Sequence, residues 1–400
     1  MTLRSSILLA APVAALAVGG ALAQQAPAQQ AVPAPGAEFS SDRRPVPFEL
    51  FRGNRIFLHG TVNGHPAEVM LDSGAGASVV DASFAEGAGV TGGIDASVRG
   101  MSGTIPGRMV HGTKLGVGPL TVSASVVVID LTPISRAIGR RIDLVLGREA
   151  FDAGIVDVDF ERHEIRFRPR DGFAAPAGAM RIAMTQSGPI RRVPLAVGAA
   201  APIMADFDLG HGGSLAISQP VWSSDPAIGG LRWARGNAGG VGGMAQRRLV
   251  TLPSLSFAGQ TFQGVPALLN ESAKDLPMDG ANIGIDLLQR FRVAVDFGTN
   301  TLWLTPNRRA LAEPLPKDRL GMRMELADDR LKVVYVSPDG PGAAAGWKEG
   351  DAVVAIGDMP VTPDFYRSRY ASFTRMRAGE TLDLVRADGA HLPVVLRDFF

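Results

Sequence analysis

Two aspartates, Asp72 and Asp208, stand in glycine-rich turns that follow apolar, strand-like runs, and each is followed two residues later by a glycine. Two carboxyl groups held about 3 Å apart cannot both ionise, so such a pair shares one proton and can activate a water molecule by general acid–base catalysis. Nearby glycines let backbone N–H groups approach the acids closely. This chemistry requires elements that bring two distant loops together.

An internal repeat predicts those elements. Gly147 and Gly284, each at the end of an apolar run, are 137 positions apart (284 − 147), and so are two Asp-Phe pairs that end at Phe160 and Phe297 (297 − 160). The two aspartates are 136 positions apart (208 − 72). A fixed period of this kind indicates copies of one structural unit. We therefore expect two copies, each presenting one carboxylate in an equivalent loop.

Short strand-like segments dominate both copies. Residues 55–62 and 67–71 flank Asn63-Gly64, a strong signal for a β-hairpin turn. Residues 142–147 indicate a buried strand that ends at a glycine, and residues 156–167 alternate. We predict a mainly β protein in which each copy is a partly closed barrel or sandwich. The first lobe is expected at 46–172 and the second at 180–308.

Composition excludes several function classes. At 400 residues the chain is too long for one typical core. The absence of cysteine excludes disulfides, thiolate catalysis and cysteine-ligated metals. The six histidines show no metal-ligand spacing, so no metal or other cofactor is predicted. A net charge of +1, without basic clusters interleaved with aromatics, argues against a nucleic-acid partner.

The N-terminus is typical of an exported protein. Arg4 precedes an almost unbroken apolar run at 7–18, and Ala21-Leu22-Ala23 is a small-x-small cleavage site. We predict a signal peptide at 1–23, followed at 24–45 by a disordered linker rich in Gln, Ala and Pro. The mature protein is expected in the periplasm or outside the cell, with no integral membrane segment.

The loop Leu71-Asp72-Ser73-Gly74, its preceding hairpin and the later Leu144-Val145-Leu146-Gly147 resemble elements of retropepsin-like and pepsin-like aspartic proteases. The resemblance covers roughly residues 46–310. It implies a two-lobed, acid-protease-like β-barrel fold and an aspartic endopeptidase that hydrolyses peptide or protein substrates. It assigns Asp72 and Asp208 as catalytic. It also assigns loop support to Ser73, Gly74 and Gly210, and a flap to Gly100, Met101, Ser102 and Gly103, with a counterpart at Gly239–Gly243.

The second copy departs from that family's pattern. Leu209 stands where the family has Thr or Ser, whose hydroxyl bonds across the lobe interface, although Ser73 could do so from its own side. Asn282 replaces an apolar residue before Gly284, and Asp206 is a conceivable substitute acid. Two alternatives follow. The second lobe could be a non-catalytic cap, making the protein a peptide-binding envelope protein, or first lobes from two chains could pair.

Residues 318–400 resemble a PDZ domain of the bacterial protease-associated type, on the evidence of Pro341-Gly342-Ala343-Ala344-Ala345-Gly346-Trp347 and the following Gly350-Asp351. The resemblance implies that Leu320-Gly321-Met322 offers backbone N–H groups to a peptide C-terminal carboxylate, beside a strand edge open to an added β-strand. A packing module that has lost ligand binding is the alternative.

Overall fold

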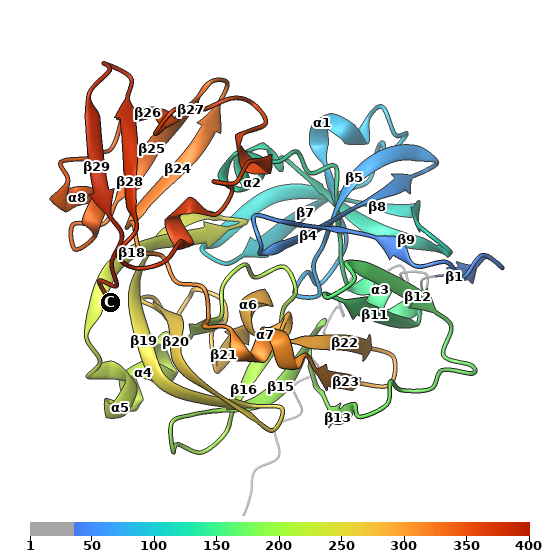
Figure 1. Ribbon diagram of the computed structural model, residues 1–400. Coiled ribbons are helices and arrows are strands. Elements are labelled where there is room, and N and C mark those ends of the chain that lie inside the picture. Colours follow the sequence, from blue (N-terminus) through green and yellow to red (C-terminus); the bar gives the residue numbers. More distant parts are fainter. Residues whose placement is uncertain (1–35) are drawn as a thin grey trace, which may run out of the picture. The chain divides into compact units, whose positions relative to one another are not determined.

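The structure, a computed structural model, describes residues 36–400 (Figure 1). The predicted signal peptide at 1–23 and residues 24–35 of the predicted linker lie outside the described residues. The chain is mainly β, with an acid-protease-like arrangement of strands. We refer below to residues 36–172 as the first lobe, 180–308 as the second lobe and 318–400 as the C-terminal region.

The first lobe is built on a nine-stranded sheet with the order β1-β9-β6-β10-β5-β4-β8-β7, and β3 beside β4. Because β8 also pairs with β9, six of these strands form a closed barrel. Its strands are β1 Gly36–Phe39, β3 Glu49–Phe51, β4 Arg55–Val62, β5 His65–Leu71, β6 Val79–Asp81, β7 Ile94–Gly100, β8 Gly103–Val117, β9 Leu120–Ile129 and β10 Leu144–Leu146. Its helices are α1 Ala82–Ala85, α2 Thr132–Ile138 and α3 Arg148–Ala153.

The second lobe repeats this barrel. Its eight strands follow the order β14-β15-β16-β21-β17-β20-β19-β18, and a β15–β19 pairing closes the ring. They are β14 Thr185–Ser187, β15 Ile190–Val197, β16 Ile203–Phe207, β17 Leu215–Ile217, β18 Trp233–Gly240, β19 Gly243–Phe257, β20 Gln260–Asn270 and β21 Ala281–Ile283. The helices are α4 Gln219–Ser224, α5 Pro226–Gly229, α6 Ile285–Leu288 and α7 Arg308–Ala312. Two copies of one β unit, as the repeat predicts, are therefore present.

A six-stranded sheet joins the lobes in the order β13-β23-β22-β11-β12-β2. At its centre Val156, Asp157 and Val158 of β11 pair with Val295, Ala294 and Val293 of β22, and these strands lie side by side in Figure 1. The strands are β2 Val46–Pro47, β11 Ile155–Asp159, β12 Glu164–Arg168, β13 Met180–Ala183, β22 Phe291–Asp296 and β23 Thr301–Pro306. The alternating segment at 156–167 thus pairs across the lobes instead of closing the first lobe alone.

The predicted disordered linker is wrong at its C-terminal end, because Gly36–Phe39 forms strand β1. β1 pairs antiparallel with β9, from Gly36 opposite Ser123 to Phe39 opposite Leu120. The Phe39 ring also lies against Gly154. A strand at a sheet edge leaves backbone groups unpaired, and a short added strand satisfies them whatever its side-chain composition. The Gln-, Ala- and Pro-rich composition carries no signal for that pairing.

The C-terminal region forms a fourth sheet in the order β24-β25-β26-β28-β29, with β27 beside β26. Its elements are β24 Met322–Ala327, β25 Arg330–Val336, α8 Pro341–Ala344, β26 Ala352–Ile356, β27 Met359–Pro360, the 3₁₀ turns η1 Phe365–Arg367 and η2 Phe373–Arg375, β28 Thr381–Arg386 and β29 His391–Val395. One apolar cluster joins this sheet to the first lobe, where Phe51 and Phe57 belong to the same core as Tyr366 and Leu320. No helix within residues 36–400 has the length and apolar content needed to cross a bilayer.

Candidate active site

Asp72 and Asp208 occupy equivalent places in the two barrels. Asp72 follows β5 and its backbone N–H donates to Leu146 at 3.0 Å, because β5 and β10 run parallel and end together. The Asp208 N–H donates in the same way to Ile283, the last residue of β21, at 3.1 Å. Each aspartate therefore leaves the end of a central barrel strand and enters a glycine turn.

The structure brings these two carboxyl groups into contact. A Cβ atom built on Gly74 would lie 2.5 Å from the Asp208 carboxyl carbon, and one built on Gly210 would lie 2.2 Å from that of Asp72. The proximity of Asp208 is also one cause of the raised pKa of Asp72, after burial. Each acid thus occupies the space that a side chain on the opposite loop would need. Neither Gly74 nor Gly210 has a positive φ, so glycine is required at these positions for space and not for backbone conformation.

Ser73 ties the two loops together from one side. Its hydroxyl donates to the Phe207 carbonyl at 3.0 Å and accepts from the Leu209 N–H at 2.9 Å. Leu209, which has no hydroxyl, is fully buried in the apolar core. Only Ser73 therefore supplies a hydroxyl that hydrogen-bonds across the lobes at these two positions. The Leu209 side chain, at the equivalent position of the second loop, contributes apolar packing instead.

Replacing Ser73 by alanine is expected to lower the free energy of unfolding by about 1–3 kcal/mol, because the buried Leu209 N–H and Phe207 C=O would both lose their partner. Chemical denaturation of the intact chain measures this change. Ser187→Ala, at an exposed position on β14, is the matched control and should change little. Equal effects of the two substitutions would contradict the bridging role.

The two carboxyl groups are held unequally. Asp72 accepts one backbone hydrogen bond, from Gly74 at 2.9 Å. Asp208 accepts three, from the backbone of Gly210 at 2.8 Å, the backbone of His211 at 2.9 Å and the Asn282 amide at 2.8 Å. Hydrogen bonds to a carboxylate favour its charged form. Burial and the adjacent Asp208 raise the pKa of Asp72 well above its ordinary value. Of the two acids, Asp72 is therefore the one whose surroundings favour the protonated form.

Asn282 and Arg55 are site residues that sequence reasoning missed. Asn282 breaks the apolar pattern before Gly284, and that departure was the available signal, because its amide supports Asp208. Arg55 begins β4 of the first lobe and crosses to the second, where a Cβ on Gly212 would lie 1.2 Å from its Nη1. Its positive charge lowers the pKa of Asp72, opposing the larger effects of burial and Asp208. No sequence signal distinguished Arg55 from the other arginines of the chain.

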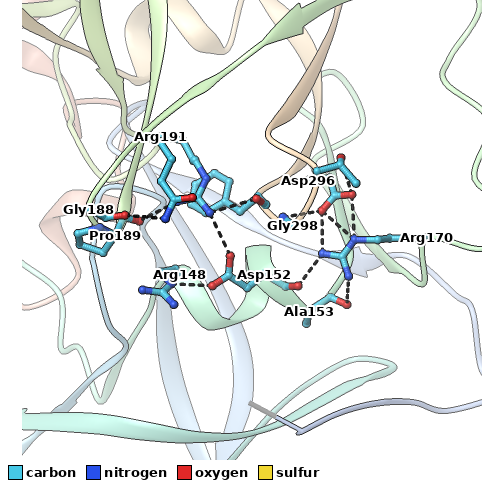
Figure 2. Close-up of polar contacts among 12 residues, drawn as sticks. Arg148, Asp152, Ala153, Arg170, Gly188, Pro189, Arg191, Asp296 and Gly298 are labelled. Carbon is cyan, nitrogen blue, oxygen red and sulfur yellow. Dashed lines mark hydrogen bonds and ion pairs between the residues drawn. The ribbon is translucent and has the colours of Figure 1, made fainter. Parts of the chain in front are cut away.

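Arg191 is the second-lobe equivalent of Arg55 (191 − 55 = 136). It crosses to the first lobe, where it lies 3.6 Å from Asp152, which also pairs with Arg148 at 2.6 Å (Figure 2). Its guanidinium donates to the Phe297 carbonyl at 3.1 Å and stacks on the Phe297 ring. Arg191 is thus held at the lobe interface away from the aspartate pair, whereas the charge of Arg55 acts on both aspartates.

The predicted flap is the tip of the β7–β8 hairpin, where Gly100 pairs with Gly103. The equivalent β18–β19 hairpin turns between Gly240 and Gly243, so Gly103 corresponds to Gly243. The tips touch each other, because a Cβ on Gly100 would lie 2.0 Å from the Val241 carbonyl oxygen. The Met101 carbonyl accepts from Leu276, and the Ser102 hydroxyl accepts from the buried Arg247 at 3.0 Å.

Asp206 is not placed as a substitute acid. It lies on β16, and its carboxylate accepts from the Arg192 guanidinium at 2.7 Å. Arg192 also pairs with Asp279 at 2.8 Å. Two residues along a strand should share a face, but Asp208 has already left β16 for its turn and points to Asp72. An Asp206–Arg192 ion pair is a structural contact of the second lobe.

The predicted capture of a peptide carboxylate by Leu320-Gly321-Met322 is wrong. The N–H groups of Leu320 and Gly321 both donate to the Asp318 carboxylate, at 3.0 and 3.2 Å, and all three residues of the loop are buried. Helix α2 of the first lobe also contacts β24, the edge strand expected to accept an added strand. The chain's own carboxylate occupies these donors, which the loop pattern alone does not reveal.

The fold and the paired carboxyl groups define a two-lobed protein of the acid-protease type. Residues 58–150, which contain the Asp72 loop and β10, match the model of a family described as aspartyl protease. This match supports a retropepsin-like aspartyl protease domain in this region of the chain, and with it protease activity. No curated protein matched the chain. Within residues 36–400, no three His, Asp or Glu side chains gather where a metal ion could bind.

Proposed function

We propose that this protein is an exported aspartic endopeptidase whose catalytic residues are Asp72 and Asp208. The observation that carries the proposal is the contact between the two carboxyl groups, each seated against the glycine of the opposite loop. Carboxyl pairs that share one proton are suited to hydrolysis of an amide, because they combine a base and an acid in one site. The family match to residues 58–150 supports the same class of reaction.

The unequal hydrogen bonding of the two acids supports the following roles. Asp208, ionised, accepts a proton from a water molecule as that water attacks the carbonyl carbon of the scissile peptide bond. Asp72 donates the shared proton to the carbonyl oxygen, giving a neutral tetrahedral diol. Collapse of the diol then breaks the C–N bond as Asp208 returns its proton to the leaving nitrogen and Asp72 recovers its own. Each cycle thus restores the starting protonation.

The substrate is a peptide or an unfolded segment of a protein that lies beneath the two hairpin tips. We assign both tips, Gly100–Gly103 and Gly240–Gly243, to a pair of flaps that must separate before the substrate can bind. Flexible glycine tips are suited to that movement. Export is supported by the N-terminal sequence pattern, and the periplasm or the exterior is the proposed location. We also assign the C-terminal region to a PDZ-like domain, supported by its motif and by the separate sheet that it forms.

A single chain is the proposed working unit. Pairing of first lobes from two chains is not needed to complete the site, because Asp72 already has an acidic neighbour, Asp208, within the chain. The alternative of a non-catalytic second lobe rested on Leu209. Against it stand the three hydrogen bonds that Asp208 accepts and the Ser73 bridge, which holds the loops in register without a second hydroxyl.

Cleavage of a peptide library by the intact chain, measured across a range of pH, tests this function. We expect cleavage that a statine-type inhibitor blocks, with a bell-shaped dependence of kcat/KM on pH. Because the pKa of Asp72 is raised, activity should persist above the ordinary range of a carboxyl group and fall when Asp72 loses its proton. Cleavage that rises steadily with pH, or that the inhibitor leaves intact, would contradict the mechanism.

Arg55→Gln provides a variant for the same experiment. Removing this positive charge should raise the pKa of Asp72 further, so the alkaline limb of the profile should move to higher pH. Arg191→Gln is the matched control, since Arg191 faces Asp152 instead of the aspartate pair, and it should leave the limb in place.

A further inference from the structure

A cavity of about 310 Å³ lies next to the Asp208 loop, outside the aspartate pair. One wall is Gly212–Leu215, which continues that loop, and a second is formed by Arg235–Asn237 of the β18–β19 hairpin. The third wall belongs to the C-terminal region and includes Met322 and Phe373. The cavity therefore adjoins the segment that continues the Asp208 loop, beside the place proposed above for the substrate.

The two lobes differ at this point. In the first lobe Ser78 donates to Glu149 at 2.7 Å. The equivalent residues of the second lobe are Ser214 and Asp286, which is one methylene shorter. Asp286 instead forms an ion pair with Arg375 of the C-terminal region. The Ser214 hydroxyl, which lines the cavity and is 3 % exposed, has no partner among the residues that the structure describes.

Arginines give the cavity a positive wall. Four arginines and two aspartates, Asp286 and Asp318, line it. Three of the arginines have carboxylate partners, in the pairs Arg375–Asp286, Arg323–Glu325 and Arg235–Asp339. Arg52 has no carboxylate within 4.0 Å in residues 36–400.

Arg52 is also fixed in position. Its guanidinium lies 4.1 Å from the centre of the Tyr366 ring, and its Nη1 donates to the Ile138 carbonyl at 3.0 Å. Asn54, two residues later, donates to the Gly212 carbonyl at 2.8 Å, which ties this turn to the Asp208 loop. Burial lowers the pKa of Arg52, and the positive charge of the nearby Arg375 lowers it further. The guanidinium groups of Arg52 and Arg375 are thus near neighbours, and of the two only Arg375 has a carboxylate partner in the described residues.

We propose that this cavity is a substrate subsite for an acidic side chain, whose carboxylate is bound by Arg52 and by the Ser214 hydroxyl. The proposal rests on the proposed function, since it specifies which peptides the same cleft prefers. It also gives the C-terminal region a direct part in selectivity, because Tyr366 positions Arg52 and Arg375 neutralises Asp286. A guanidinium is suited to this task, as its planar donors match a carboxylate.

Peptide binding to the intact chain carrying Asp72→Asn tests the subsite without cleavage. The probes are fluorescent octapeptide pools in which one position at a time is fixed as Glu, Gln or Lys, and binding is followed by fluorescence anisotropy. At one position Glu should bind about ten-fold more tightly than Gln, as expected for a charge-assisted hydrogen bond, and Lys more weakly than both. Equal binding of Glu and Gln at every position would overturn the proposal.

Variants of Arg52 in the same background separate charge from packing. Arg52→Gln should remove the preference for Glu, whereas Arg52→Lys should retain part of it, because the positive charge remains. Arg386→Gln, at an arginine of the C-terminal region outside the cavity wall, should keep the full preference. A preference for Glu that survives Arg52→Gln would overturn the assignment. Cleavage by the unmutated chain decides the proposed function separately, so the two can fail independently.

Discussion

Replacing either Asp72 or Asp208 by asparagine is expected to reduce kcat/KM for peptide cleavage by roughly 10³-fold or more, since an amide can neither accept nor release the shared proton. Both variants should remain folded. The free energy of unfolding should not fall in Asp72→Asn, because the amide removes the cost of placing two acids in contact. Cleavage kinetics and thermal unfolding of the same preparations measure the two effects.

Asp206→Asn is the matched control for this experiment, because Asp206 lies two residues before Asp208 but pairs with Arg192. It should retain activity. Loss of cleavage in Asp72→Asn with full cleavage in Asp208→Asn would show that first lobes pair between chains. Full cleavage in Asp72→Asn would remove the mechanism altogether.

Adding one methyl group to either loop is expected to be nearly as damaging. In Gly210→Ala the new Cβ would lie 2.2 Å from the Asp72 carboxyl carbon, and in Gly74→Ala it would lie 2.5 Å from that of Asp208. Contacts this short force the carboxyl groups apart. Because displacement by about 1 Å can cost 10²-fold in rate, we expect a loss of that order in kcat/KM. Neither glycine has a positive φ, so backbone strain does not contribute.

Gly87→Ala is the control for the methyl substitutions, because the nearest atom to a Cβ at Gly87 is 3.8 Å away. Its activity and thermal stability should match those of the unmodified chain. Full activity in Gly74→Ala and Gly210→Ala would mean that the two acids do not approach each other as the structure has them.

The sequence was informative where a local pattern repeats. The 136-residue spacing of Asp72 and Asp208 identified two equivalent loops, and the structure places them in contact. The Asn63-Gly64 turn and the apolar run before Gly147 predicted the strands that position Asp72. The positions of these strands follow from turn chemistry and hydrophobic patterning, which act within a few residues.

Features that depend on contacts between distant residues could not be predicted. The interlobe sheet requires β11 to pair with β22, and the pattern of either strand is satisfied equally well by a partner in its own lobe. The donors of Leu320 and Gly321 were expected to be free, because nothing in the motif shows that Asp318 bonds them. Arg55 and Arg375 act from other lobes or regions, and isolated arginines carry no sequence signal of that kind.

The fusion of both lobes in one polypeptide also changes how this site can evolve. In a symmetric homodimer every substitution appears on both sides of the axis. Here Leu209 replaces a hydroxyl on one side while Ser73 keeps the bridge from the other, and Asn282 supports only Asp208. Each half of the gene can therefore diverge under its own selection, one half preserving the acid and the other acquiring new neighbours for the base. In a single chain the surroundings of the two aspartates can therefore differ, whereas in a homodimer they must be identical.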